Sequence, residues 1–132
     1  MKEEKRNIVK ELSLEFSIKI LDFVGKNSNK KTALNPNQIV RSGTSIGAMI
    51  REAQEAESRK DFIHKLKIAF KEAEETEYWL ILFASEYQSP EILDLKYRLV
   101  EIKKLLSKII SSSIRKAITD VDTAVEPAPV IG

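Results

Sequence analysis

Few side chains of this sequence could carry out covalent chemistry. Among 132 residues there is a single histidine, His64, and no cysteine. A di-iron helical bundle needs Glu-x-x-His on two helices and two further inward-facing glutamates, so this chain cannot assemble that site. It also lacks a Gly-x-Ser-x-Gly turn and a second base to support a nucleophile. We therefore expect no catalytic residue, no metal site and no cofactor, and a protein that is not an enzyme.

Closely spaced glutamates are the other groups that could act as acids or bases. Glu72 with Glu75, and Glu74 with Glu77, are each three residues apart and would share a helix face. Such pairs are common on exposed helices, where they form ion pairs with lysines or with a neighbouring helix. We interpret them as ordinary helix charges rather than catalytic carboxylates.

Clustered lysines have a clearer chemical meaning, because closely spaced cations neutralise phosphate groups. The chain has 22 basic and 20 acidic residues, but residues 117–132 hold three acids and no base, which leaves residues 1–116 with a net charge of +5. The isoelectric point of about 8.8 is lower than is usual for a basic nucleic-acid-binding domain. The candidate nucleic-acid-binding residues are Lys60, Lys65, Lys67, Lys71, Lys103, Lys104 and Lys108.

Charge is distributed unevenly over residues 58–88. Residues 58–71 hold five basic groups and one acid, whereas residues 72–88 hold five acids and no base. This order opposes the helix macrodipole, which favours acids at the amino-terminal end. We expect compensation from a neighbouring helix, another subunit or a polyanion; a solvated helix face without a function is the alternative.

Hydrophobic spacing predicts that these residues lie on helices. From Ile92 to Ile109, apolar residues recur in alternating steps of three and four. Three other segments carry a stripe with helical spacing: Leu12, Phe16, Ile20 and Phe23; Ile39, Gly43, Ile46, Ile50 and Ala53; and Phe62, Leu66, Ala69, Ala73, Thr76, Leu80 and Phe83. Ser89 before Pro90 is a typical helix start. The predicted helices cover about 7–25, 37–57, 58–87 and 90–116. The predicted capping residues are Asn35, Ser58 and Ser89.

Two glycines inside the second predicted helix indicate close helix packing. Gly43 and Gly47 are one turn apart, and each costs helix stability relative to alanine. The segment lacks the Gly-Lys-Ser/Thr ending of a phosphate-binding loop, so we interpret both glycines as helix contacts.

Four helices with short connections predict an all-α fold, an antiparallel up-down four-helix bundle over residues 1–116. Residues 117–132 hold two prolines and no helical repeat, so we expect a disordered acidic tail there. The longest apolar run, from Tyr78 to Ala84, is far shorter than the roughly 20 residues of a membrane-spanning helix. No signal sequence is recognisable, and we expect a cytoplasmic protein that binds no membrane.

Several apolar residues fall outside the main helix stripes. A bundle helix buries only one face, so this surplus indicates either a broad core or association with further copies of the chain, which we favour. The residues concerned are Leu14, Ile18, Leu21, Ile63, Phe70, Tyr78, Trp79, Ile81, Leu93, Val100 and Leu105.

Residues 40–82 carry a recognisable pattern, in which Arg-Ser-x-x-Ser-Ile is followed by Lys-x-Phe and Glu-x-Glu. This pattern resembles the bacterial four-helix-bundle family encoded in intervening sequences of 23S rRNA genes. The same superfamily includes the accessory protein of diversity-generating retroelements. Met49 departs from the family, which usually has asparagine there. The family's signature residues correspond to Arg41, Ser42, Ser45, Ile46, Glu52, Phe62, Ala69 and Glu77.

The resemblance implies a homo-oligomer, with a pentameric ring of bundles favoured. It also implies RNA or DNA as a partner, and a reverse transcriptase if the gene is linked to a retroelement. Together with the lysine clusters, it leads to the hypothesis of a non-enzymatic homo-oligomeric bundle that binds nucleic acid, with RNA favoured. The alternative hypothesis is a protein-interaction scaffold whose charges serve solubility and subunit pairing.

Overall fold

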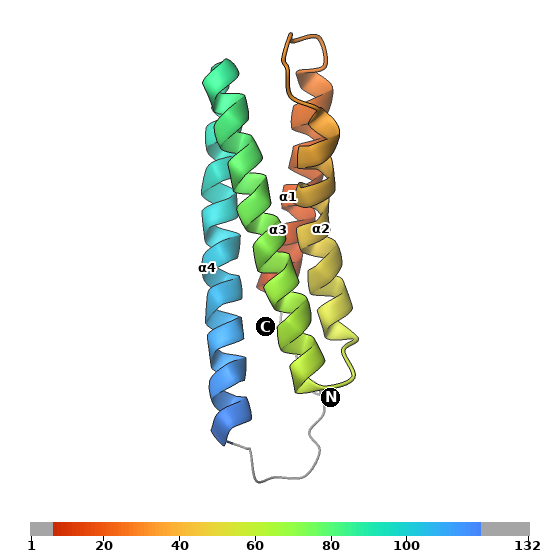
Figure 1. Cartoon of the computed structure of the whole chain (residues 1–132), viewed down its shortest axis with the longest axis vertical. Coiled ribbons are helices and arrows are strands. Elements are labelled where there is room, and N and C mark those ends of the chain that lie inside the picture. Colours follow the sequence, from red (N-terminus) through yellow and green to blue (C-terminus); the bar gives the residue numbers. More distant parts are fainter. Residues whose placement is uncertain (1–6, 120–132) are drawn as a thin grey trace.

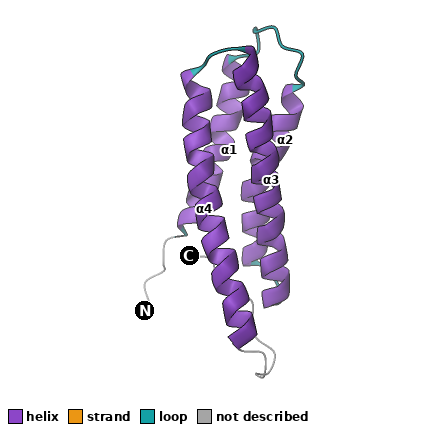
Figure 2. Cartoon of the chain, turned by 60° about the vertical axis from the view of Figure 1, so that its left-hand side comes forward, coloured by secondary structure: helices purple, strands orange, loops and turns teal. Residues whose placement is uncertain are grey.

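The computed structural model describes residues 7–119, which form an all-α bundle (Figure 1). Within this range the chain forms four helices and no strand. Consecutive helices run in opposite directions and are joined by short loops (Figures 1 and 2). The expected all-α up-down bundle is confirmed. The helices are α1 (Ile8–Lys26), α2 (Pro36–Gln54), α3 (Arg59–Glu86) and α4 (Pro90–Thr119).

Side-chain caps explain where the helices begin. The Asn35 side chain accepts a hydrogen bond of 2.9 Å from the Asn37 backbone N–H, and Pro36 occupies the first turn, where its missing N–H costs nothing. Ser58 accepts a bond of 3.1 Å from the Asp61 backbone N–H. The predicted starts are correct to within about one residue. α4 continues to Thr119, three residues beyond the predicted end, while residues 120–132 of the predicted tail lie outside the described part.

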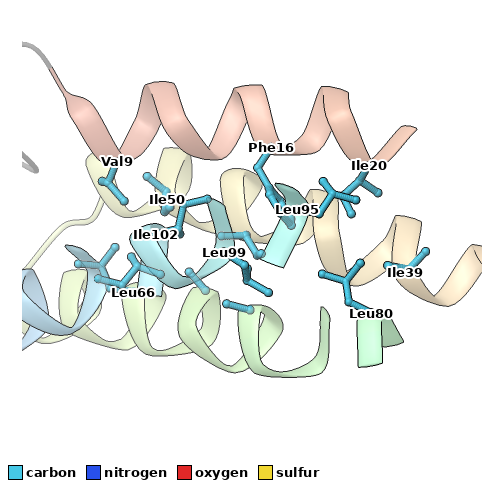
Figure 3. Close-up of a cluster of buried hydrophobic side chains, with 14 of the residues drawn as sticks. Val9, Phe16, Ile20, Ile39, Ile50, Leu66, Leu80, Leu95, Leu99 and Ile102 are labelled. Atoms are coloured by element: carbon cyan, nitrogen blue, oxygen red, sulfur yellow. The ribbon is translucent and has the colours of Figure 1, made fainter. Parts of the chain in front are cut away.

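The core lies on the central axis, where apolar side chains of all four helices converge (Figure 3). The predicted stripes are confirmed: every stripe position of α2 and α3 is buried, as are those of α4 from Ile92 to Leu106. On α1, Val9 and Ser13 complete the buried face, whereas Leu12 is only partly buried. Each helix contacts its two neighbours around the bundle, so α1 lies diagonally opposite α3.

The two interior glycines of α2 lie directly against α1. A Cβ atom at Gly43 would come within 3.0 Å of the Ile20 side chain, and one at Gly47 within 3.3 Å of Ser13 Oγ. Real Cβ atoms essentially never come closer than the first of these distances. The predicted close helix contact is therefore confirmed.

The surplus apolar residues divide into two groups. Four of them pack against the core and are partly buried: Ile63, Phe70, Trp79 and Leu105. The other seven are exposed, together with Tyr97: Leu14, Ile18, Leu21, Tyr78, Ile81, Leu93 and Val100. The core of one chain therefore does not account for the whole apolar surplus.

Candidate nucleic-acid interface

The amino-terminal half of α3 presents a row of exposed cations. Lys60, Lys67 and Lys71 are exposed, and their spacing places them on one face of the helix with His64. By the rise of an α-helix, Lys60 and Lys71 are about 16 Å apart along the axis. No ion pair within residues 7–119 involves any of these three lysines. Their charges are therefore available to solvent or to a bound anion.

Lys65 lies on a different face of α3 and serves another purpose. Its ammonium group is 3.3 Å from a carboxylate oxygen of Glu52 on α2. This contact spans the α2–α3 interface, so part of the Lys65 charge is offset within the bundle.

The three candidate lysines on α4 also differ in their surroundings. Lys104 and Lys108 are exposed, whereas Lys103 is half-buried and forms ion pairs with Glu74 and Glu77 of α3, the latter at 3.4 Å. Burial alone would lower the pKa of Lys103, but hydrogen bonding and attraction from the two glutamates outweigh it, so the pKa is raised. Lys103 therefore holds α3 to α4 and contributes less to an outward basic surface.

A shallow groove lies between α3 and α4, and its lysines come from α4. Phe70 and Val100 form its apolar part, and Lys103 and Lys104 form its charged part. The Lys103 ammonium lies 5.8 Å from the centre of the Phe70 ring. Lys71 follows Phe70 on α3 and is exposed, but it does not line this groove. Lys71 and Lys104 therefore lie on two adjacent helices, and of the two only Lys104 lines the groove.

Basic residues of the neighbouring helices compensate the negative charge of the carboxy-terminal half of α3. Compensation by a neighbouring helix is one of the alternatives that the sequence predicts. Arg41 of α2 pairs with Glu72 at 3.2 Å and with Glu75, whose carboxylate also accepts a 3.0 Å hydrogen bond from the indole N–H of Trp79. The Arg41 and Trp79 hydrogen bonds hold the pKa of Glu75 below its usual range, although burial opposes them. Lys103 provides the same compensation from α4. These glutamates are structural ion-pair partners.

The signature residues connect helices rather than line a cavity. Arg41, Ser42 and Glu52 contact α3, and Glu77 contacts α4. The Ser45 hydroxyl donates a 2.6 Å bond to the Arg41 carbonyl. Ile46, Phe62 and Ala69 are fully buried, and Met49 packs against the core as an apolar side chain. We interpret this set as the residues that specify the packing of α2 on α3.

The structure contains a further basic cluster that was not predicted from the sequence. Arg59, Lys108, Arg115 and Lys116 line a single hollow at the end of the bundle where α1 and α3 begin and α4 ends. The spacing of 108, 112, 115 and 116 on one helix face is the signal that could have indicated it. Of the seven predicted lysines, only Lys108 belongs to this hollow.

Neither a metal centre nor a membrane span occurs in the described part of the chain. Within residues 7–119 no group of three or more histidine, cysteine or acidic residues is placed to hold a metal ion. His64 lies exposed on the outer face of α3. None of the helices within this range is long and apolar enough to cross a bilayer.

The fold and the contacts between its helices define an all-α four-helix bundle, and comparison with known proteins assigns the family. Residues 5–108 match the family model of the 23S rRNA-intervening sequence proteins, and the chain belongs to this family. It is similar to a protein of unknown function from the S23 ribosomal protein family of Bacteroides thetaiotaomicron VPI-5482, whose crystal structure was solved at 1.70 Å resolution. The two are 48% identical, with a TM-score of 0.72, over 77% of this chain and 97% of the other. No curated protein gave a match.

Proposed function

We propose that this chain is a non-enzymatic, homo-oligomeric helical bundle that binds nucleic acid, with RNA favoured. The observation that carries the proposal is the set of lysines whose charges are not used inside the bundle. Within residues 7–119, five of the seven candidate lysines form no ion pair, and all five are exposed: Lys60, Lys67, Lys71, Lys104 and Lys108. Phosphate groups bind such clustered and unpaired cations.

Exposed apolar surfaces support self-association. On α1, Leu14, Ile18 and Leu21 form one apolar stripe, and they are 47%, 59% and 53% exposed. Further exposed apolar residues lie on the two helices joined by the α3–α4 loop: Tyr78 and Ile81 on α3, and Leu93, Tyr97 and Val100 on α4. Exposed apolar patches rimmed by polar residues commonly mark protein interfaces.

The positions of the two apolar surfaces favour a ring. α1 lies diagonally opposite α3, so the exposed Tyr78 and Ile81 of α3 lie on the far side of the bundle from the α1 stripe. Pairing of two unlike surfaces gives head-to-tail contacts, which close into a ring when the rotation between copies permits it. We propose a pentamer, in which five copies of the lysine surface multiply the modest charge of each chain.

RNA binding by charge-matched variants tests the proposal. A labelled RNA stem-loop is titrated with the parent chain and with the triple variant Lys60→Gln, Lys67→Gln, Lys71→Gln. The control carries Lys10→Gln, Lys19→Gln and Lys31→Gln, which remove the same charge from α1 and the following loop. We expect the α3 variant to lose about tenfold or more in affinity at about 100 mM salt, and the control to lose little.

Equal losses in the two variants would contradict a defined lysine surface. The alternative function, a protein-interaction scaffold, is favoured by the internal use of Lys65 and Lys103, which pair with Glu52, Glu74 and Glu77. Absence of RNA binding by an intact oligomer at low salt would support that alternative instead.

A further inference from the structure

The hollow at the end of the bundle combines a cationic wall with an apolar floor. Its volume is about 390 Å³, and it lies between the start of α1, the start of α3 and the last turns of α4. Ile8, Val9, Leu105 and Ile109 provide apolar surface, and Ser112 and Ser113 provide hydroxyl groups. In Figure 2, α4 continues past the start of α1.

The charge of this hollow is one-sided. Arg59, Lys108, Arg115 and Lys116 line it, and no acidic residue among those described does so. Arg59 is only 9% exposed and already interacts with another group of the chain, so the other three basic residues provide the charge available to a ligand. No ion pair within residues 7–119 involves Lys108, Arg115 or Lys116. The first turns of α1 and α3 lie at the same end and add their positive dipole ends.

We propose that this hollow binds a phosphate-bearing nucleotide, either free or at the phosphorylated end of a nucleic acid strand. Lys108, Arg115 and Lys116 would hold the phosphate, since guanidinium and ammonium groups form strong, charge-assisted hydrogen bonds to phosphate oxygens. The aliphatic floor offers a surface for the base or sugar, and the volume falls within the range usual for small-molecule sites.

The inference extends the proposed function to a specific phosphate site, but the hollow can be tested without RNA. ADP, adenosine and inorganic phosphate are titrated calorimetrically into the full chain at about 50 mM salt, where surface charges are weakly screened. We expect ADP to bind and to bind more tightly than either adenosine or inorganic phosphate. Equal affinity for ADP and inorganic phosphate would contradict a nucleotide site.

Two adjacent serines provide a matched pair of variants. Ser112 lines the hollow, whereas Ser111 does not, and both are exposed on α4. Ser112→Glu introduces a negative charge into the cationic wall, and Ser111→Glu introduces the same charge about 100° further round the helix. We expect the first variant to lose ADP affinity by about tenfold or more and the second to retain it, because the new carboxylate repels the phosphate and competes for the same cations. Lys108→Gln against Lys104→Gln repeats the comparison by removing charge.

Oligonucleotides with and without a 5′-phosphate identify the source of the nucleotide. Tighter binding of the 5′-phosphorylated strand, lost in Ser112→Glu and kept in Ser111→Glu, indicates a strand end. ADP binding without this preference indicates a free nucleotide, and both results support the site. ADP binding without RNA binding would contradict only the proposed function. RNA binding that both serine variants retain, without ADP binding, would overturn the nucleotide site alone.

Discussion

The hydroxyl groups of Ser42 on α2 and Thr76 on α3 lie 2.9 Å apart inside the bundle, and both side chains are fully buried. Thr76 Oγ1 also lies 2.8 Å from the Glu72 carbonyl oxygen of its own helix. A hydroxyl has one proton, so when Thr76 donates to that carbonyl, Ser42 donates to Thr76. This pair is a polar contact between the two helices that carry most of the family signature.

Thr76→Val keeps the shape of the side chain but removes the hydroxyl. The change leaves Ser42 without its partner in the core, and we expect the free energy of unfolding to fall by about 1–3 kcal/mol. Urea denaturation, monitored by circular dichroism, measures this free energy. The double variant Ser42→Ala, Thr76→Val removes both polar groups and should recover part of the loss. If the effects of Ser42→Ala and Thr76→Val on the free energy of unfolding were strictly additive, the two hydroxyls would not interact in the folded protein.

Gly43→Ala tests the close approach of α1 and α2. Alanine favours a helix by about 1 kcal/mol over glycine, but the added methyl group would meet the stiff, fully buried Ile20 at 3.0 Å. Because overpacking costs about 1–3 kcal/mol, we expect a net loss of stability. Gly25→Ala is the control: no atom lies within 4 Å of its Cβ position, and we expect unchanged or slightly increased stability. Stabilisation by both changes would mean that α1 and α2 are farther apart than described.

The single tryptophan reports on the Arg41–Glu75 ion pair. Trp79 donates to the Glu75 carboxylate, whose pKa is held below the usual value of 4.5 mainly by the Arg41 hydrogen bond. Because the folded carboxylate binds its proton more weakly than the unfolded one, the pair stabilises the fold above the unfolded pKa. That contribution is lost as the pH falls towards the lowered, folded pKa.

Trp79 fluorescence between pH 2 and 6 should therefore change with a midpoint below the usual glutamate value. In Arg41→Gln the midpoint should rise, and in Glu75→Gln the transition should disappear. Fluorescence that changes at the usual glutamate pKa in the parent chain would contradict the ion pair.

Periodicity predicts the helices and most of the core, but not the polar contacts between helices. Heptad spacing identifies Thr76 as a core position, yet its contact with Ser42 depends on how α2 and α3 are rotated against each other. Lys103 and Lys104 are a second case in which periodicity does not predict the contacts of a polar residue. Adjacent residues on a helix point about 100° apart, so Lys103 faces the glutamates of α3 while Lys104 faces solvent. Spacing alone places Lys108, Arg115 and Lys116 on one face of α4, but no local pattern reveals that this face meets Arg59 of α3 and the start of α1.

Ile18→Glu tests the α1 apolar stripe as a subunit interface. Ile18 is 59% exposed, so the change should leave the folded chain intact but place a charge in the proposed contact. We expect the parent chain to have several times its 15.0 kDa mass in native mass spectrometry, and the variant to dissociate towards the monomer. Gln38→Glu, at the exposed start of α2, is the control and should assemble like the parent. A parent chain that is monomeric at micromolar concentration would contradict the ring.

The most direct test of the account is the salt dependence of RNA binding by the assembled parent chain. Phosphate contacts through lysines release bound counterions, so the logarithm of the association constant should fall linearly with the logarithm of salt concentration. We predict retention of a structured RNA at about 50 mM salt and a steep loss of binding by about 200 mM. Absence of binding by the intact oligomer at the lower concentration, or an affinity that does not change between the two, would contradict binding through the lysine surface.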